Sequence, residues 1–136
     1  MKRITIFFRL TLTALLIIFM LPFSACKGEK TKDGTYLQIS QEEAKHLMDT
    51  EENYIILDVR TEEEFREGHI EGAIQISHDE IKDKAGTFLP DKDQMILVYC
   101  RSGRRSKLAA EDLSEMGYTD VREFGGIIDW KYDIVK

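Results

Sequence analysis

The clearest structural signal in this chain lies at residues 94–106, Gln94-Met95-Ile96-Leu97-Val98-Tyr99-Cys100-Arg101-Ser102-Gly103-Arg104-Arg105-Ser106. The run at residues 94–99 is almost entirely apolar, which is typical of a strand covered on both faces of a parallel sheet. It ends at a cysteine, and a short arginine-rich loop then leads into a helical pattern at residues 107–116. We therefore predict a strand, a loop and a helix in succession, with Cys100 at the carboxyl end of the strand.

The predicted surroundings of Cys100 favour its thiolate form. The following helix contributes partial positive charge and free backbone N–H groups, and three arginines add full charges. Such surroundings can lower a thiol pKa from about 8.5 to about 4–7, and the thiolate is the nucleophilic form. An inert buried thiol is the alternative, but arginines are costly to place around a core cysteine.

The other loop residues have expected roles around an anionic substrate. Gly103 lets the backbone curl so that N–H groups converge on the sulfur, and Ser102 can add a hydroxyl. Arg105 closes the loop and can serve mainly to hold it, whereas Ser106 is expected to cap the helix. For the arginines and for Ser102, ordinary solvated loop polarity is the alternative. The predicted substrate-binding residues are Arg101, Ser102, Gly103, Arg104 and Arg105.

Strands and helices alternate along the rest of the chain. Short apolar runs predict strands at residues 36–39, 54–59, 73–76 and 121–124. Helices are predicted after Ser40 and Thr61, where capping boxes occur, at residues 77–85 as a polar helix or turn, and around Trp130, with a connector at residues 86–93. This alternation predicts a parallel α/β sheet. Ligands of such sheets bind at the carboxyl ends of strands, where Asp58 and Cys100 both fall.

Residues 1–25 have the layout of a secretory signal. A basic start is followed by an apolar stretch at residues 10–21 and by small residues before Cys26. The stretch is short for a membrane span, which needs about 20 apolar residues. Residues 23–26 also resemble the bacterial lipoprotein signal, in which the cysteine is lipidated. A plain signal peptide cut near Ala25 and an uncleaved signal anchor are the alternatives.

We accordingly divide the chain into a lipoprotein-type signal peptide at residues 1–25, a flexible tether at residues 26–35 and one domain at residues 36–136. Removal of Lys2, Arg3 and Arg9 with the signal changes the formal charge from −6 to −9. An acidic domain argues against nucleic acid as a partner. If Cys26 carries lipid, Cys100 has no intramolecular disulfide partner and is a candidate reactive thiol.

Four motifs together resemble a single-domain rhodanese. They are Leu57-Asp58-Val59-Arg60, Gly68-His69-Ile70-Glu71-Gly72-Ala73, the Cys100–Ser106 loop, and Gly125-Gly126-Ile127 through Trp130. Their order and spacing match the family, and the resemblance covers nearly all of residues 36–136. It implies a rhodanese-like α/β domain with a five-stranded, mainly parallel sheet flanked by helices on both faces.

The resemblance also implies sulfurtransfer. A donor such as thiosulfate or a persulfide would give its outer sulfur to Cys100 as nucleophile, and a thiol or cyanide would remove it. Asp58 and Arg60 match positions that support the active-site loop, where we expect the carboxylate to pair with a loop arginine. His69 is expected to be a packed histidine and not a catalytic partner. No cofactor is expected, and the sequence shows no cluster of residues at metal-ligand spacing.

Loop length distinguishes this activity from related ones. Residues 100–105 form a C-x4-R loop, as in sulfur-transferring rhodaneses, whereas Cdc25-like phosphatases have C-x5-R and a wider cradle for phosphate. The shorter loop favours a sulfurtransferase over a phosphatase or an arsenate reductase that uses the same thiolate. A non-catalytic module that carries sulfur or binds a partner is a further alternative.

The expected setting is the bacterial cell envelope. We expect an exported monomer, lipid-anchored through Cys26 on the periplasmic or extracellular face. Its expected partners are a small anionic sulfur donor and a thiol or cyanide acceptor, with no nucleic acid.

Overall fold

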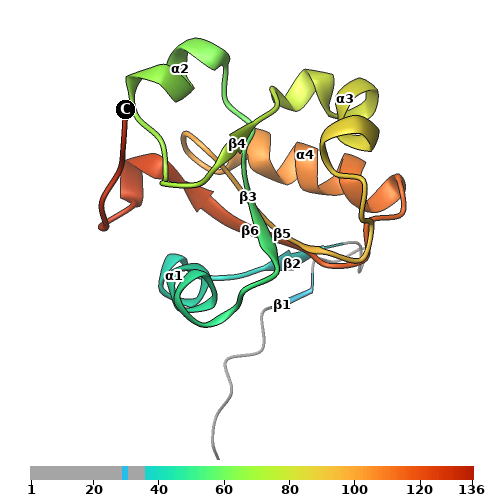
Figure 1. The fold of residues 1–136 in the computed structure, drawn as a ribbon, viewed down its shortest axis with the longest axis horizontal. Helices are drawn as coiled ribbons and strands as arrows, with labels where there is room; N and C mark the ends of the chain where they lie inside the picture. Colours follow the sequence, from blue (N-terminus) through green and yellow to red (C-terminus); the bar gives the residue numbers. More distant parts are fainter. Residues whose placement is uncertain (1–28, 31–35) are drawn as a thin grey trace, which may run out of the picture.

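The computed structural model describes residues 29–30 and 36–136 of the chain (Figure 1). The predicted signal peptide and the lipidation site Cys26 lie outside the described residues, as does most of the predicted tether. Within that tether, Glu29–Lys30 form the short strand β1, which pairs with the first strand of the domain.

One twisted sheet forms the centre of the domain, and its strand order is β1-β2-β6-β5-β3-β4. After β1, its strands are β2 (Leu37–Gln38), β3 (Tyr54–Asp58), β4 (Ile74–Gln75), β5 (Met95–Cys100) and β6 (Val121–Gly126). Neighbouring strands in the part β2-β6-β5-β3-β4 pair in parallel, and β1 pairs with β2 in the antiparallel sense. The predicted five-stranded parallel sheet is therefore confirmed, with β1 as an addition at its edge.

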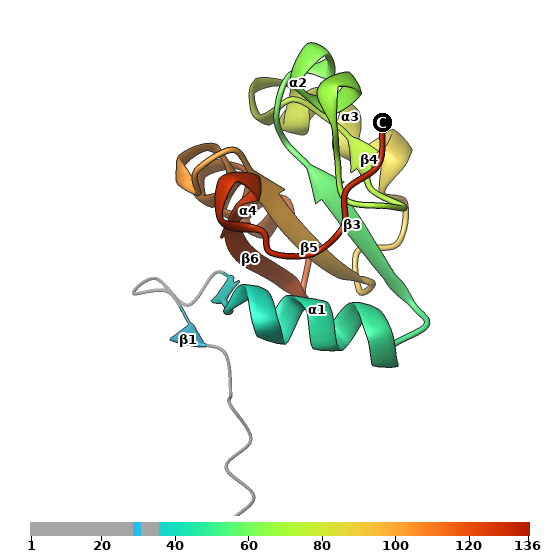
Figure 2. The ribbon, with the colours of Figure 1, turned by 90° about the vertical axis from the view of Figure 1, so that its left-hand side faces the viewer.

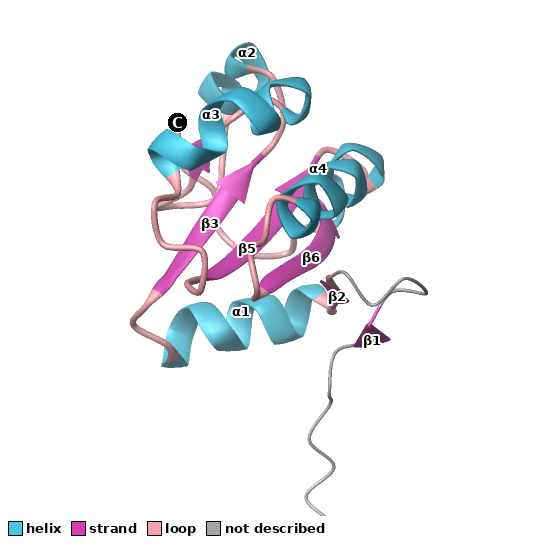
Figure 3. Cartoon of the chain, turned by 90° about the vertical axis from the view of Figure 1, so that its right-hand side faces the viewer, coloured by secondary structure: helices cyan, strands magenta, loops and turns pink. Residues whose placement is uncertain are grey.

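Helices cover both faces of this sheet. They are α1 (Gln41–Thr50), α2 (Glu62–Glu67), α3 (Ile81–Phe88) and α4 (Arg104–Glu115), with 3₁₀ turns at His78–Glu80 and Ile127–Asp129. Figures 2 and 3 show α1 on one side of β5 and β6 and α4 on the other.

The alternation of side chains along β5 builds a core on each face. Ile96 and Val98 belong to the cluster that contains buried residues of α3 and α4. Leu97 and Tyr99 belong to the opposite cluster, together with Ala44 of α1. Because successive strand residues point to opposite faces, a strand that is apolar at every position is buried on both sides. This explains why residues 94–99 carry no polar alternation.

The predicted capping signals are largely confirmed. The Ser40 hydroxyl accepts a hydrogen bond from the Glu43 N–H at 3.0 Å, and Thr61 and Glu64 form a complete capping box at the start of α2. Gly117 adopts a left-handed backbone (φ 91°) just after α4, as expected for a residue that follows a helix.

Some predicted boundaries are wrong. Helix α4 begins at Arg104 and not at residue 107, and its N-cap is Gly103, whose left-handed backbone (φ 95°) turns the chain directly into the helix. The prediction that Ser106 caps this helix is therefore wrong, because Ser106 lies inside its first turn. Helix α3 extends to Phe88, into the segment predicted as a connector. In the described part of the chain, the helices are too short or too polar to span a membrane.

Candidate active site

Cys100 lies at the carboxyl end of β5, between the ends of β3 and β6. Its residue is only 1% exposed, and the loop that follows it turns back over its side chain before α4 begins. The parallel neighbours bring Asp58 beside Tyr99 and Gly126 beside Cys100. This edge of the sheet is where the strand pattern predicts a ligand site.

Backbone N–H groups converge on the sulfur of Cys100. The Gly103 N–H donates to Sγ at 3.1 Å, and the Ser102 and Ser106 N–H groups also point at it. Burial raises the pKa of the Cys100 thiol, but the hydrogen bonds from these N–H groups and the contact with the Ser106 side chain outweigh burial, so the pKa lies below its ordinary value. The thiolate is thus favoured chiefly by hydrogen bonds from the loop and the helix start.

Ser106 lies beside this sulfur and Glu123 lies beyond Ser106, and the sequence interpretation assigns neither of them to the site. The Ser106 hydroxyl is 3.4 Å from Cys100 Sγ and donates to Glu123 Oε1 at 2.6 Å. Both Ser106 and Glu123 are buried. The strand pattern contains a signal that Glu123 is buried. Residues two apart in a strand share a face, and Val121 lies in the core.

Arg105 is held in an ion pair with Glu64. Its guanidinium donates two parallel hydrogen bonds to the carboxylate, at 2.7 and 2.8 Å. The hydrogen bond from Arg105 holds the pKa of Glu64 at about 2. This contact ties the first turn of α4 to α2, and it fits the expectation that Arg105 holds the loop. Arg101, Ser102 and Arg104 are exposed, whereas Gly103 is buried.

The end of β6 lies directly beneath the loop. A side chain at Gly126 would place its Cβ 2.2 Å from the Arg101 carbonyl oxygen, which no real contact permits. The Ile128 N–H donates to that same oxygen at 3.3 Å, and Gln41 of α1 donates to the Gly126 oxygen at 2.7 Å. The glycine pair of the sequence therefore supports the loop from below.

Asp58 pairs with Arg60, and the expectation that it pairs with a loop arginine is wrong. Its carboxylate accepts from Arg60, including a contact of 2.6 Å from Nη2, and Arg60 also donates to the Gly68 oxygen at 2.7 Å. The network joins the end of β3 to the end of α2 and lies against the Tyr99 ring. The carboxylate that pairs with the loop is Glu64, which sequence reasoning assigned only to a helix cap.

His69 is a packed residue, as expected. Its ring stacks on Phe65 at a centroid distance of 3.7 Å, and its Nδ1 lies 3.0 Å from the Phe65 oxygen. Its backbone pairs with Val135. Within the described residues, there is no group of three His, Cys, Asp or Glu side chains that could hold a metal ion.

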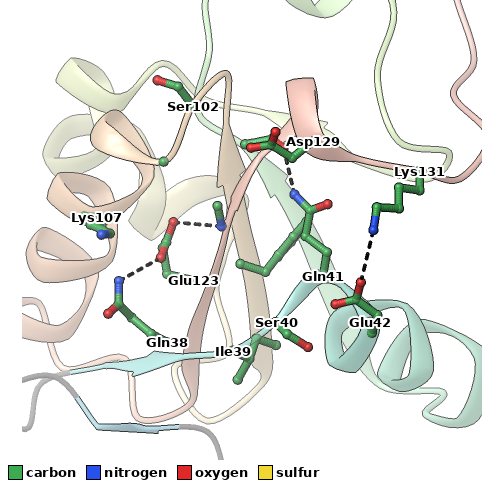
Figure 4. Close-up of a pocket in the computed structure, with 14 residues that line it drawn as sticks. Gln38, Ile39, Ser40, Gln41, Glu42, Ser102, Lys107, Glu123, Asp129 and Lys131 are labelled. Atoms are coloured by element: carbon green, nitrogen blue, oxygen red, sulfur yellow. Dashed lines mark hydrogen bonds and ion pairs between the residues drawn. The ribbon is translucent and has the colours of Figure 1, made fainter.

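A polar groove borders the loop (Figure 4). It encloses about 530 Å³ between the start of α1, the end of β6 and the loop, which it meets at Ser102 and Gly103. Glu123 forms part of its wall, where Gln38 donates to Glu123 Oε2 at 3.3 Å. Cys100 is not among the residues that line it.

Comparison with known proteins gives a consistent result. Residues 40–133 match the Rhodanese-like domain family. The Thiosulfate sulfurtransferase PspE of Escherichia coli (strain K12) is 47% identical over 73 residues, which cover 54% of this chain and 70% of PspE. The Adenylyltransferase and sulfurtransferase UBA4 of Candida albicans is 36% identical over 104 residues, which cover 71% of this chain but only 24% of that longer protein.

Solved structures agree. A rhodanese with anions from E. coli superposes with a TM-score of 0.58 at 43% identity, over 61% of this chain and 98% of that one. The residues matched by the family, 40–133, contain strands β3 to β6 and the cysteine loop described above. This chain therefore belongs to the rhodanese-like domain family.

Proposed function

We propose that the protein is a sulfurtransferase that carries a sulfane sulfur on Cys100. The observation that carries the proposal is the set of N–H groups directed at Cys100 Sγ, because such a cradle stabilises a thiolate and also a negatively charged persulfide. The likeness to proteins named thiosulfate sulfurtransferase supports it.

The first step is attack of the Cys100 thiolate on the outer sulfur of a donor such as thiosulfate. A new S–S bond forms at Cys100, the S–S bond of thiosulfate breaks, and its electron pair leaves with sulfite. The negative charge of the thiolate ends on the outer persulfide sulfur, so charge is conserved. The loop N–H groups stabilise this charge where it develops.

The second step returns Cys100 to its thiolate. An acceptor such as cyanide or a thiolate attacks the outer sulfur, and the electron pair of the persulfide bond returns to Cys100. The sequence contains two cysteines, and within the described residues Cys100 is the free one. An acceptor from outside the domain is therefore needed to discharge it.

We assign different tasks to the three arginines. Arg101 and Arg104 are exposed at the loop, where they can attract an anionic donor and neutralise the departing sulfite. Arg105 is engaged by Glu64 and holds the loop in shape. Ser102, also exposed on the loop, contributes its backbone N–H to the sulfur.

Steady-state assays of the purified domain test the proposal. Thiosulfate with cyanide should give turnover that is lost in Cys100→Ser, while an aryl phosphate and arsenate should give none. Turnover of the aryl phosphate or of arsenate, without sulfurtransfer, would favour the phosphatase or reductase alternative. A Cys100→Ser protein that still supports the cellular role would instead favour a non-catalytic module.

We also propose that the protein is exported and lipid-anchored at the cell envelope through Cys26. The sequence of residues 1–26 supports this, since a basic start, an apolar stretch and small residues precede the cysteine. Expression in a bacterium with labelled fatty acid should label the full chain and leave Cys26→Ser unlabelled. Equal labelling of both proteins, or of neither, would contradict the anchor.

A further inference from the structure

Glu123 is a buried carboxylate that the transfer chemistry above does not use. Its residue is 2% exposed. Within the described chain, the groups that donate hydrogen bonds to it are neutral: the Ser106 hydroxyl at 2.6 Å, the Gly125 N–H at 2.9 Å and the Gln38 amide at 3.3 Å. Lys107, an exposed residue of α4, lines the same groove (Figure 4), but the hydrogen bonds that Glu123 accepts come from these neutral groups.

A continuous hydrogen-bonded path joins Glu123 to the nucleophile. Cys100 Sγ lies 3.4 Å from Ser106 Oγ, and Ser106 Oγ lies 2.6 Å from Glu123 Oε1. A serine hydroxyl has one proton. While Glu123 is ionised, the short contact assigns that proton to the carboxylate, and Ser106 can only accept from the Cys100 thiol.

The thiolate state needs the opposite arrangement. Ser106 donates a hydrogen bond to the Cys100 sulfur in two cases. Either its original proton has passed to Glu123 and it holds the former thiol proton, or its hydroxyl has rotated away from Glu123. We propose that Cys100, Ser106 and Glu123 form a proton relay in which Glu123 stores the thiol proton during sulfur transfer. Glu123 acts through Ser106 and does not itself contact the sulfur.

The proposed transfer balances internally. The S–H bond of Cys100 breaks as an O–H bond forms at Ser106, and the original Ser106 O–H bond breaks as an O–H bond forms at Glu123 Oε1. A thiol and a carboxylate become a thiolate and a carboxylic acid, with no change in total charge and no co-reactant. When an acceptor has removed the sulfur, the proton can return by the same path.

The location of Glu123 suits this task. Its other oxygen, Oε2, faces Gln38 in the wall of the polar groove, whereas Cys100 is not among the residues that line it (Figure 4). Arg101 and Arg104, which are exposed on the loop, are not among the residues that line this groove.

The pH dependence of Cys100 alkylation by iodoacetamide tests the relay. In the unaltered protein, the fraction of molecules with the thiol proton on Glu123 does not depend on pH as long as Cys100 and Glu123 share one proton between them. The rate of Cys100 alkylation should therefore level off as the pH falls below the thiol pKa. In Glu123→Gln and in Ser106→Ala, the rate should instead fall about tenfold per pH unit below the thiol pKa.

Two further variants complete the test. Ser114→Ala is the matched control, because Ser114 lies in the same helix and donates to the Ala110 oxygen, so its profile should follow the unaltered protein. The Ser106→Ala, Glu123→Gln double variant should have the profile of either single variant, since each breaks the same path. Equal slopes in the unaltered protein and Glu123→Gln, or effects of the two substitutions that add, would overturn the relay.

Infrared difference spectroscopy gives a direct readout. Conversion of resting protein to persulfide should produce a protonated-carboxyl band that is absent in Glu123→Gln, and the lack of such a band would also overturn the proposal. The relay rests on Cys100 as the sulfur carrier proposed above. The alkylation profile needs no sulfur donor, so its failure would leave the proposed transfer standing.

Discussion

At the scale of single residues, hydrogen bonds account for the thiolate character of Cys100 better than the neighbouring arginines do. The residues that lower its pKa against the opposing effect of burial are Ser102, Gly103 and Ser106. The guanidinium of Arg105, which follows the loop, forms an ion pair with Glu64. The arginine-rich composition of the loop predicts that arginine charges stabilise the thiolate. In the structure, backbone N–H groups surround the sulfur and the arginines Arg101 and Arg104 are exposed on the loop.

Glu64→Gln tests the role assigned to Arg105. Loss of the charge-assisted contact, whose two side chains are 19% and 24% exposed, should lower the free energy of unfolding at neutral pH by about 1–2 kcal/mol. It should also lower kcat, because the loop loses its tie to α2. Urea denaturation and thiosulfate assays measure both effects.

The control for this substitution is Glu62→Gln in the same helix. Glu62 pairs with Arg66 at the surface, where both side chains are largely exposed, so its loss should change stability by only about 0.3–0.5 kcal/mol. Equal effects of the two substitutions would show that the Arg105 contact is an ordinary surface pair.

The same pair predicts an acid-dependent loss of stability. The pKa of Glu64 is about 2 in the folded protein, against an ordinary value of 4.5. A lowered folded pKa means that the stabilisation is complete above pH 4.5 and disappears as pH falls toward 2. The stability difference between the unaltered protein and Glu64→Gln should shrink over this interval. A difference that stays constant down to pH 2 would contradict the assigned ion pair.

At the scale of structural elements, the sequence predicts more of the strands than of the loop and its helix. Apolar runs and capping boxes located β3, β5, α1 and α2 because these signals act within a few residues. The helical pattern places the start of α4 too late, because a left-handed glycine and hydrogen bonds to the cysteine sulfur replace the usual side-chain cap. The Arg105–Glu64 and Ser106–Glu123 pairs join residues 41 and 17 positions apart, and no local pattern records such contacts.

Gly126→Ala tests the support that β6 gives to the loop. The added methyl would meet backbone atoms of Arg101 and Ser102 at 2.2–2.6 Å, so the loop must move. We expect a loss of about 1–3 kcal/mol in stability and about a hundredfold in kcat/KM, since displaced reacting groups lose their alignment. Thermal denaturation and steady-state kinetics measure these effects, and a variant with unchanged kinetics would contradict the proposed support.

Gly86→Ala provides the matched glycine substitution in α3. A side chain at Gly86 meets nothing within 4 Å, and glycine destabilises a helix interior relative to alanine. This variant should therefore gain about 0.5–1 kcal/mol in stability without a change in kcat/KM. Destabilisation would show that α3 is packed differently from the structure described here.

At the scale of the whole molecule, a chain of net charge −6 presents an exposed pair of arginines beside its nucleophile. The general field repels anions, so the local charges must overcome it for an anionic donor to approach. The rest of the domain contributes rigidity: two cores, one on each face of the sheet, hold the ends of β5 and β6 together.

Ionic strength should reveal this local attraction. Salt screens exposed charges, so kcat/KM for thiosulfate should fall as salt is added, and Arg101→Gln, Arg104→Gln or both should flatten that dependence. Alkylation by the neutral reagent iodoacetamide is the control and should vary little with salt. A salt dependence that survives the double substitution would place the anion site elsewhere.

The mass of the intact domain after treatment with thiosulfate tests the central claim most directly. The unaltered protein should gain the mass of one sulfur atom, located at Cys100 by peptide mapping and removed by cyanide, while Cys100→Ser gains nothing. A protein that acquires no sulfur at Cys100 from thiosulfate or from any persulfide donor would contradict a role in sulfur transfer.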